Sequence, residues 1–541
     1  MSQTGAAASQ PRKGERALPF LDIFGDRWRN FVYAFLGALF VFGYPLTNVA
    51  IHIDSETNIA NGDLIAFISL GRWGVVLTHI LFGIQHTVPY FIQIVSLALI
   101  CLSALITAFA LGLTGGNAVM LALLYVSVPQ LAYQLEFMNQ CESVMLGLFC
   151  ASVASCLIIK RVRGNSRQTF ASIALSVVLL AFAIGCYQSL LFIPATICCL
   201  YCANSLLEDA KTSNVLGEAA IMLVVMIAAY AVCQTIAKIV QLQSGVPPAA
   251  YFDKMVHWGT APAQQIVRDL LVRLFQDVTQ GEYYGDELYK TIWLPVGAGI
   301  VVALRHTDGL IRKALFVAFA LALPLMPFFV ELVVGGALPA RVSVAQAAAF
   351  AGAWALVLSR LRACEAIELA KEQPLISWSF FTSSDGLRAF FQTLSGRRLA
   401  TIVVAVSLLF GAFRTSRLFA ADTAALAADR LLGNRVVTVL YTNYPDFDAT
   451  RTPVYFAGAY ASPNLWRPPS SDVFGSSFFA WDGGNPVRIV AFLKVVGIAN
   501  LTMASREEEA RVKDQVADLP VWPNPYSVHQ IDGVMVVRLG R

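Results

Sequence analysis

Residues 88–112, VPYFIQIVSLALICLSALITAFALG, contain no Asp, Glu, Lys or Arg. An uncharged apolar run of this length can cross the hydrocarbon core of a membrane, which is about 30 Å thick, as a helix. Similar runs recur through most of the chain, and a hydropathy pass predicts about eleven spans. They lie near 30–50, 88–112, 117–135, 143–160, 168–185, 187–205, 216–241, 291–304, 314–335, 342–358 and 399–420. The shorter segment 71–84 is expected either as an interfacial helix or as an extra short span.

The composition agrees with a polytopic membrane protein. Of the 541 residues, 57% are hydrophobic and only 14% are charged, whereas soluble globular chains carry about 25% charged residues. The mean hydropathy is +0.62. This balance excludes a soluble enzyme, a disordered chain and a nucleic-acid-binding module. Cys198, Cys199 and Cys202 have a metal-like spacing, but no His or carboxylate is close to them in the sequence, so we interpret them as packing residues.

The distribution of Lys and Arg predicts the orientation of the bundle, because loops rich in these residues stay in the cytoplasm. With residues 1–29 placed inside, the inner segments hold almost all the Lys and Arg of the short loops, whereas the short outer loops hold Arg72 and Arg341. The membrane domain, 30–420, then has its loops 51–87 and 242–290 outside. The C-terminal residues 421–541 also lie outside.

Composition changes after about residue 421, and residues 421–541 are predicted to form a small extracytoplasmic α/β domain. RVVTVLY (435–441) and PVYFAG (453–458) are predicted as short strands. SREEEARVKDQV (505–516) is predicted as an exposed helix, and VHQIDGVMVVRL (528–539) as a hairpin around Asp532 and Gly533. The chain has no evident internal repeat, although repeats are common in secondary transporters.

The first outer loop, IHIDSETNIANGDLIAFISLGRWG (51–74), holds two acids close to the end of the first span. Asp54 and Glu56 are expected at the membrane interface, where a lipid headgroup would lie; a solvated polar loop is the alternative. Arg72 offers a planar fork of donors that suits a phosphate. Trp73 suits the interface and could stack on a sugar.

Other polar and aromatic residues near the outer ends of spans are weaker candidates. Arg341 is a second candidate phosphate ligand, with snorkelling to the interface as the alternative. Aromatic residues mixed with acids in the long outer loop suit carbohydrate binding or, equally, an interfacial aromatic belt. The candidates for acceptor binding are Glu136, Tyr251, Trp258, Tyr283 and Tyr284.

Three strings resemble the Gtr type II family of membrane glucosyltransferases, which is related to the GT-C superfamily. They are IDSETNIANGDLIAFISLGRWG (53–74), YQSLLFIPATICCLY (187–201) and TPVYFAGAY (452–460), and the resemblance covers roughly residues 30–460. It implies an all-α, GT-C-like bundle in the bacterial inner membrane. By this resemblance Asp54 and Glu56 fall on the family's acidic motif. Arg72 and Trp73 fall on its Gly-Arg-Trp motif, and Tyr187 and Gln188 on its Tyr-Gln motif.

The same resemblance implies a reaction. A single sugar, expected to be glucose, would move from a polyprenyl-phosphate donor to an extracytoplasmic glycan such as O-antigen or lipopolysaccharide. Polyprenyl phosphate is already a good leaving group, so the site needs a base, assigned first to Asp54 and then to Glu56, and cations at Arg72 and Arg341. This arrangement favours inversion.

No cofactor is required by this logic, although an acid-rich site could hold a divalent metal. The expected partners are membrane lipid, the lipid-linked donor and a glycan or lipid-linked acceptor, with no nucleic acid and an undetermined oligomeric state. Two alternatives stay open: a lipid-linked glycan transporter or flippase, and an outer-face glycan polymerase or ligase.

Overall fold

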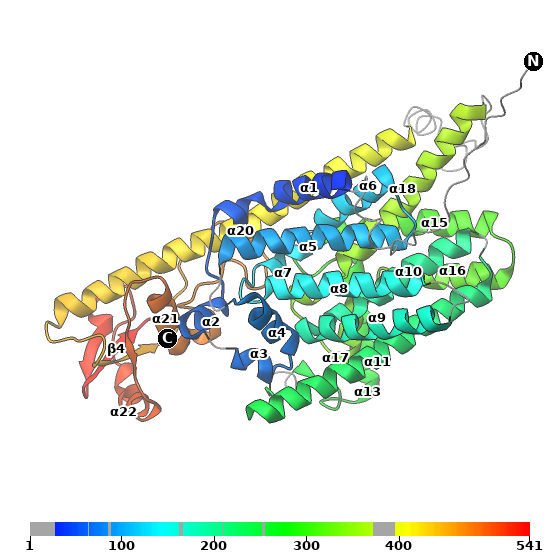
Figure 1. The fold of residues 1–541 in the computed structure, drawn as a ribbon. Helices are drawn as coiled ribbons and strands as arrows, with labels where there is room; N and C mark the ends of the chain where they lie inside the picture. Colours follow the sequence, from blue (N-terminus) through cyan, green and yellow to red (C-terminus); the bar gives the residue numbers. More distant parts are fainter. Residues whose placement is uncertain are drawn as a thin grey trace, which may run out of the picture.

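The computed structural model describes residues 28–62, 64–84, 88–161, 166–208, 210–250, 255–371 and 395–540. A bundle of helices carries a small mixed domain at one end (Figure 1). The helices of the bundle are α1 (Trp28–Thr47), α2 (Ser55–Asn61), α3 (Ile65–Ser69), α4 (Trp73–Phe82), α5 (Pro89–Ala110), α6 (Gly115–Val126), α7 (Gln130–Leu135), α8 (Cys141–Ile159), α9 (Ser166–Cys186), η2 (Gln188–Leu191), α10 (Phe192–Leu207), α11 (Thr212–Ser244), α13 (Ala263–Thr279), α14 (Asp286–Lys290), α15 (Trp293–His306), α16 (Leu310–Ala322), η3 (Met326–Phe328), α17 (Phe329–Val334), η4 (Ala340–Val342), α18 (Gln346–Lys371) and α20 (Gly396–Asn443).

Eight helical segments of the described chain are long and apolar enough to cross a membrane, and a ninth forms if α16 and the segment Met326–Val334, bent by 53°, count as one span. The expected number of eleven is therefore not confirmed. The predicted span 117–135 is divided between α6, which has 12 residues, and α7. The predicted span 342–358 falls on α18, which is not among the eight. The segment 71–84 forms α4, whose 10 residues are too short to cross a membrane alone.

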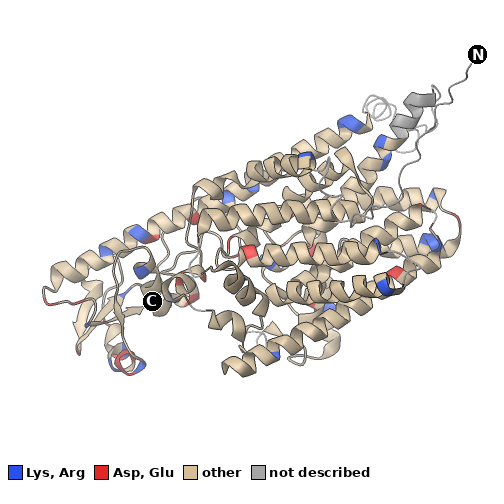
Figure 2. Ribbon diagram, viewed as in Figure 1, with Lys and Arg blue, Asp and Glu red and all other residues tan. Residues whose placement is uncertain are grey.

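One end of the bundle gathers the basic residues that the sequence places in inner loops. Arg360 Nη2 donates a hydrogen bond to Asn204 Oδ1 (2.9 Å), and Arg362 Nη1 donates one to Asn117 Oδ1 (2.8 Å). These contacts bring the end of α10, the start of α6 and the basic part of α18 together. Figure 2 shows Lys and Arg on several helices at this end, away from the C-terminal domain.

The longest helix, α20, connects the bundle to the C-terminal domain (Figure 1). Its 48 residues extend for about 70 Å, so it continues well past the predicted domain boundary at 421. The predicted strand 435–441 is wrong, because this segment is helical. Its buried residues Leu432, Val436, Val437 and Leu440 have helical spacing and form one stripe against the C-terminal core.

The C-terminal domain contains a four-stranded mixed sheet in the order β2-β1-β4-β3. The strand β1 (Pro453–Ala457) pairs in parallel with β2 (Thr502–Met503) and with β4 (Val534–Arg538). The strand β3 (Val528–Ile531) pairs antiparallel with β4 through a turn at Asp532 and Gly533, both with positive φ. The predicted strand at 453–458 and the predicted hairpin are confirmed.

Helices complete this C-terminal domain: η6 (Trp481–Gly483), α21 (Pro486–Val495), α22 (Arg506–Val516) and η7 (Pro525–Ser527). The predicted helix over 505–516 is confirmed as α22. Ser505 begins it with a capping box, in which its side chain accepts from Glu508 N and the Glu508 side chain accepts from Ser505 N.

The hydrophobic core of the C-terminal domain includes residues from the bundle. Ala50 and Ile53 from the loop after α1, and Phe137 from the segment after α7, are buried together with Leu440 and Phe479. The first outer loop is therefore anchored by its apolar residues, and its polar residues are held in place between them.

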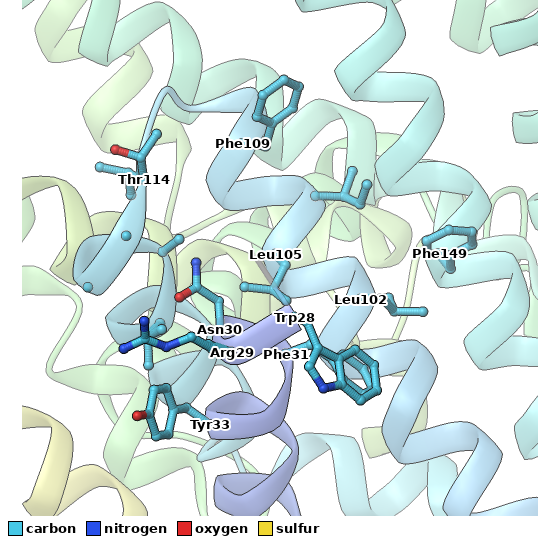
Figure 3. Close-up of a pocket in the computed structure, with 16 residues that line it drawn as sticks. Trp28, Arg29, Asn30, Phe31, Tyr33, Leu102, Leu105, Phe109, Thr114 and Phe149 are labelled. Atoms are coloured by element: carbon cyan, nitrogen blue, oxygen red, sulfur yellow. The ribbon is translucent and has the colours of Figure 1, made fainter. Parts of the chain in front are cut away.

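A groove of about 790 Å³ lies at the N-terminal end of α1, between that helix, α5 and α6 (Figure 3). Its walls include Trp28, Phe31, Leu105, Phe109 and Phe149. The 20 residues of α1 span about 30 Å, and the acidic loop follows the opposite end of this helix. The groove is therefore separate from the predicted site.

Candidate active site

The acidic residues of the first outer loop are presented by a tight turn. Asp54 has φ of 77° and precedes α2 as its N-cap residue. Asp is one of the few residues other than Gly that adopt this left-handed conformation at modest cost. Ile53, on one side of Asp54, is buried in the core of the C-terminal domain, and α2 begins on the other side. Asp54 and Glu56 both contact the C-terminal domain.

Their partner is Arg488, on α21. Its Nη2 donates to Asp54 Oδ1 at 2.6 Å and its Nη1 donates to Glu56 Oε1 at 2.6 Å. Its Nε donates to Asp482 Oδ2 at 2.8 Å. Three carboxylates therefore surround one guanidinium, and the arrangement retains an excess of negative charge when all three are ionised.

The two predicted catalytic acids differ in burial. The Asp54 side chain is 45% exposed, whereas that of Glu56 is fully buried. Burial raises the pKa of Glu56 to about 7, even though the charge of Arg488 and its hydrogen bond act to lower it. The Asp54 carboxylate is thus accessible to solvent, whereas that of Glu56 is not.

A second set of contacts converges on residues 136–142, which we name the EFMNQCE segment. Arg72 Nη1 donates to Gln140 Oε1 at 2.8 Å. The guanidinium of Arg341 lies 4.7 Å from the centre of the Phe137 ring. Since both contacts are made to a segment of seven residues, the two predicted phosphate ligands approach the same part of the molecule.

Two of the sequence motifs meet at Arg72. Its guanidinium lies over the Tyr187 ring, 4.7 Å from the centroid, in cation–π geometry. Gln188 Nε2 donates to the Leu70 carbonyl at 3.1 Å. Residues 70–72 and 187–188, far apart in the sequence, therefore form one structural unit.

Trp73 packs inside the bundle, with its ring 6.1 Å from that of Phe182. A Cβ atom at Gly185 would lie 2.5 Å from Trp73 Cε2. Glycine at this position therefore allows α9 and α4 to approach each other closely.

Comparison with known families identifies the family of the chain. A family model described as glucosyl transferase GtrII matches residues 43–359. The chain belongs to this family. The matched part is more than half of the chain and includes both acids of the outer loop and both motifs that meet at Arg72. The comparison with curated proteins found no match.

Membership of the GtrII family, together with the apolar helices, indicates a membrane glucosyltransferase. Some residues around the site of this family member lie beyond the matched range. Arg488 comes after residue 359, as does Asp472, whose Oδ2 lies 3.8 Å from Arg341 Nη1. Burial raises the pKa of Asp472, and the charge of Arg341 opposes that rise.

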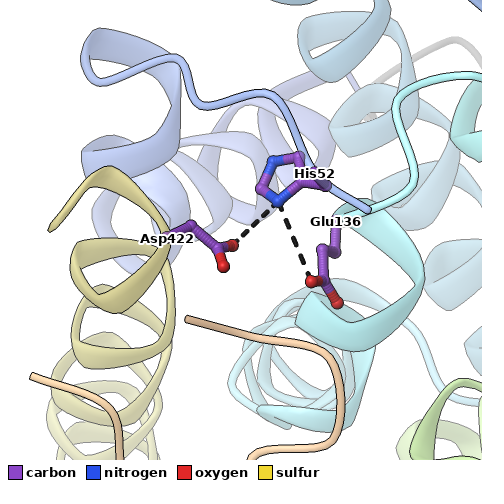
Figure 4. A group of neighbouring side chains, drawn as sticks. All are labelled: His52, Glu136 and Asp422. Carbon is purple, nitrogen blue, oxygen red and sulfur yellow. Dashed lines mark ion pairs between the residues drawn. The ribbon is translucent and has the colours of Figure 1, made fainter. Parts of the chain in front are cut away.

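A third group joins the loop, the EFMNQCE segment and α20 (Figure 4). His52 Nδ1 lies 2.8 Å from Asp422 Oδ2 and 3.8 Å from Glu136 Oε1. All three side chains are buried. Burial raises the pKa of Glu136 well above its usual value, as do the charges of Asp422 and Asp472. Among the described residues, these three could hold a metal ion.

The aromatic residues predicted to bind an acceptor make structural contacts. Tyr283 Oη donates to the Leu338 carbonyl at 2.8 Å, and Tyr284 is buried under the guanidinium of Arg414 at 4.3 Å. Trp258 is 39% exposed, and its Nε1 lies 3.1 Å from the Leu332 carbonyl. Tyr251 lies outside the described residues.

Sequence reasoning missed His52, Asp422 and Arg488. His52 stands two residues before Asp54, so its position next to the acids was a usable signal. Asp422 stands two residues after the predicted span 399–420, so its position near the end of a span was also a usable signal. The pairing of Arg488 with Asp54 and Glu56 gave no local signal, because these two partners lie more than 400 residues earlier.

Proposed function

We propose that this GtrII family member transfers one glucosyl group from a polyprenyl-phosphate donor to a glycan at the outer face of the bacterial inner membrane, such as O-antigen or lipopolysaccharide. The observation that carries this proposal is the approach of Arg72 and Arg341 to the EFMNQCE segment, beside the loop that holds Asp54. A phosphate site and a carboxylate base are the two parts that this transfer needs.

The two arginines suit the donor phosphate. Each guanidinium is planar, remains charged at any physiological pH and can bind phosphate oxygens through two parallel hydrogen bonds. As the sugar leaves the phosphate, negative charge grows on the phosphate oxygens. Donors that are already in position stabilise this developing charge without reorganisation.

The acidic group around Arg488 suits the acceptor better than the phosphate. Asp54, Glu56 and Asp482 outnumber the single guanidinium that they surround, so this group repels an anionic phosphate. A neutral sugar hydroxyl meets no such penalty. The half-exposed carboxylate of Asp54 can accept its proton, while buried Glu56 holds Arg488 in position.

The reaction is a single displacement. Asp54 takes the proton from the acceptor hydroxyl as its oxygen attacks the anomeric carbon of the donor sugar. The bond between this carbon and the phosphate oxygen breaks, and polyprenyl phosphate leaves with the electron pair, stabilised by Arg72 and Arg341. Attack from the face opposite the phosphate inverts the anomeric configuration.

The orientation belongs to the same proposal. Residues 1–29 are assigned to the cytoplasm, and the first outer loop and the C-terminal domain to the periplasm. The grouping of basic residues at the other end of the bundle supports this assignment.

The test is sugar transfer by purified protein from a polyprenyl-phosphate glucose donor to acceptor glycan. Removing one positioned donor typically costs about 10²–10³ in rate, so we expect such losses in Arg72→Ala and in Arg341→Ala. Arg451→Ala is the matched control, because the Arg451 side chain is 87% exposed on the C-terminal domain. Full transfer by the Arg72→Ala, Arg341→Ala double variant would contradict the phosphate site.

A further inference from the structure

His52, Glu136 and Asp422 come from three separate parts of the chain and meet in the interior (Figure 4). His52 lies in the loop after α1, Glu136 at the end of α7, and Asp422 in the middle of α20. Their exposed fractions are 3%, 1% and 6%. A buried imidazole and two buried carboxylates that face one another are a donor set for a metal ion.

The spacing of the donor atoms fits a common ion. His52 Nδ1 lies 2.8 Å from Asp422 Oδ2 and 3.8 Å from Glu136 Oε1, and the ligand atoms of the three residues lie within 4.8 Å of one another. With bonds of about 2.1 Å, neighbouring ligand atoms around a metal are about 3.0–3.4 Å apart. One of the two distances from His52 Nδ1 is shorter than this range and the other is longer, so small side-chain movements would bring the three ligand atoms to metal-binding distances.

The hydrogen bonding of the two carboxylates also favours a metal ion at this position. Within the described part of the chain, neither carboxylate oxygen of Glu136 has a hydrogen-bond partner. Asp422 Oδ2 faces His52 Nδ1 at 2.8 Å and forms an ion pair with it when the imidazole is protonated. The other oxygen of Asp422 accepts from Gly475 N at 2.6 Å, which turns Oδ2 toward His52. Buried carboxylate oxygens without partners are costly, and a cation would remove that cost.

We propose that His52, Glu136 and Asp422 bind one divalent cation of the Zn²⁺ or Mn²⁺ type. The imidazole ligand favours these ions over Mg²⁺, which prefers an all-oxygen shell. The bound ion would tie the first outer loop to α20. Its binding does not depend on the transfer reaction proposed above.

The second acidic cluster of the described chain supplies a contrast. Asp277, Glu282 and Glu331 also lie close together. However, Arg273 forms ion pairs with all three, so a guanidinium already supplies the positive charge there. The two clusters therefore predict different responses to metal ions.

The experiment measures metal binding directly. Full-length protein is stripped with a chelator and titrated separately with Mn²⁺ and Zn²⁺, and bound metal per chain and the melting temperature are recorded. We expect one ion per chain and a higher melting temperature. Losing even a group that supports a metal ligand costs about 10–100-fold in affinity, so Glu136→Gln and Asp422→Asn should each weaken binding at least tenfold.

Glu331→Gln is the matched control and should bind metal like the wild type. Both test substitutions keep the shape of the side chain, and the amide oxygen that Asp422→Asn introduces could still accept from Gly475 N. If the Asp422→Asn variant does not fold, the metal affinity of the Glu136→Gln variant alone tests the proposal. Stripped wild-type protein that binds neither ion would overturn the proposal. So would a folded Glu136→Gln variant with wild-type affinity for both ions.

Discussion

Replacing Glu56 by Gln tests the environment of the buried acid behind Asp54. The Glu56 carboxylate is fully buried and accepts a hydrogen bond from Arg488 Nη1 at 2.6 Å. The amide of Gln has nearly the same shape and can still accept this bond through its oxygen. The substitution therefore removes the ionisation of this side chain and leaves its packing almost unchanged.

The size of the expected change in the free energy of unfolding follows from the pKa of Glu56. Burial raises this pKa from 4.5 to about 7, a difference that corresponds to roughly 3 kcal/mol in favour of the protonated form. Since the folded protein holds this proton more tightly than the unfolded chain, the stabilisation is complete below about pH 4.5. It is lost as the pH rises through about 7. The Gln side chain does not ionise, so the Glu56→Gln variant does not lose stability in this way. Its stability relative to the wild type should therefore increase as the pH rises.

The assay is thermal unfolding of purified protein in detergent, followed by tryptophan fluorescence at several pH values from 5 to 8.5. The wild type and Glu56→Gln are compared at each pH, so that the contributions of other titrating groups cancel. Glu507→Gln is the control, because Glu507 is exposed on α22. A difference in melting temperature between the wild type and Glu56→Gln that stays constant from pH 5 to 8.5 would refute the reasoning.

Other substitutions test the remaining parts of the site. Asp54→Asn removes the proposed base and should reduce sugar transfer by about 10²–10⁴; full transfer by the Asp54→Asn, Glu56→Gln double variant would exclude a catalytic role for the loop. Arg72→Lys should retain more donor use than Arg72→Ala while losing part of it, because Lys lacks the planar pair of donors; equal and unchanged activities would remove Arg72 from the site. Arg488→Met removes the charge that lowers the pKa of Glu56, so the pH-dependent loss of stability should move to higher pH in the same unfolding series. A reporter fused after Arg541 should be active outside the cytoplasm, and activity restricted to the cytoplasm would reverse the proposed topology.

The helical bundle could be predicted because each apolar run carries its own signal. The strand predicted at 435–441 was wrong for a local reason. Its Val and Thr residues are β-branched and favour strands in isolation, but Val436, Val437 and Leu440 continue a helical stripe that starts earlier in α20. A window wide enough to include residue 432 would have contained the helical period.

The candidate site was predictable only in its local parts. Asp54, Glu56 and Arg72 stand in one loop next to the first span, where position relative to the membrane gave a reason to choose them. The contact between Arg72 and Tyr187 depends on how α4 packs against α9, and the pairing of the loop with Arg488 depends on the C-terminal domain. Such contacts follow from tertiary packing, and no spacing within a segment encodes them.

These contacts make the C-terminal part of the chain a component of the candidate site. The match to the GtrII family covers residues 43–359, but the guanidinium that faces Asp54 and Glu56 comes from α21. Asp422, whose Oδ2 lies 2.8 Å from His52 Nδ1, comes from the middle of α20, also beyond the matched region. Without Arg488, the charge that lowers the pKa of Glu56 would be lost, and this buried carboxyl would stay protonated to a higher pH. Without the C-terminal domain, Ala50 and Ile53 would also lose the core in which they are buried. The geometry of the first outer loop therefore depends on residues that follow the matched region.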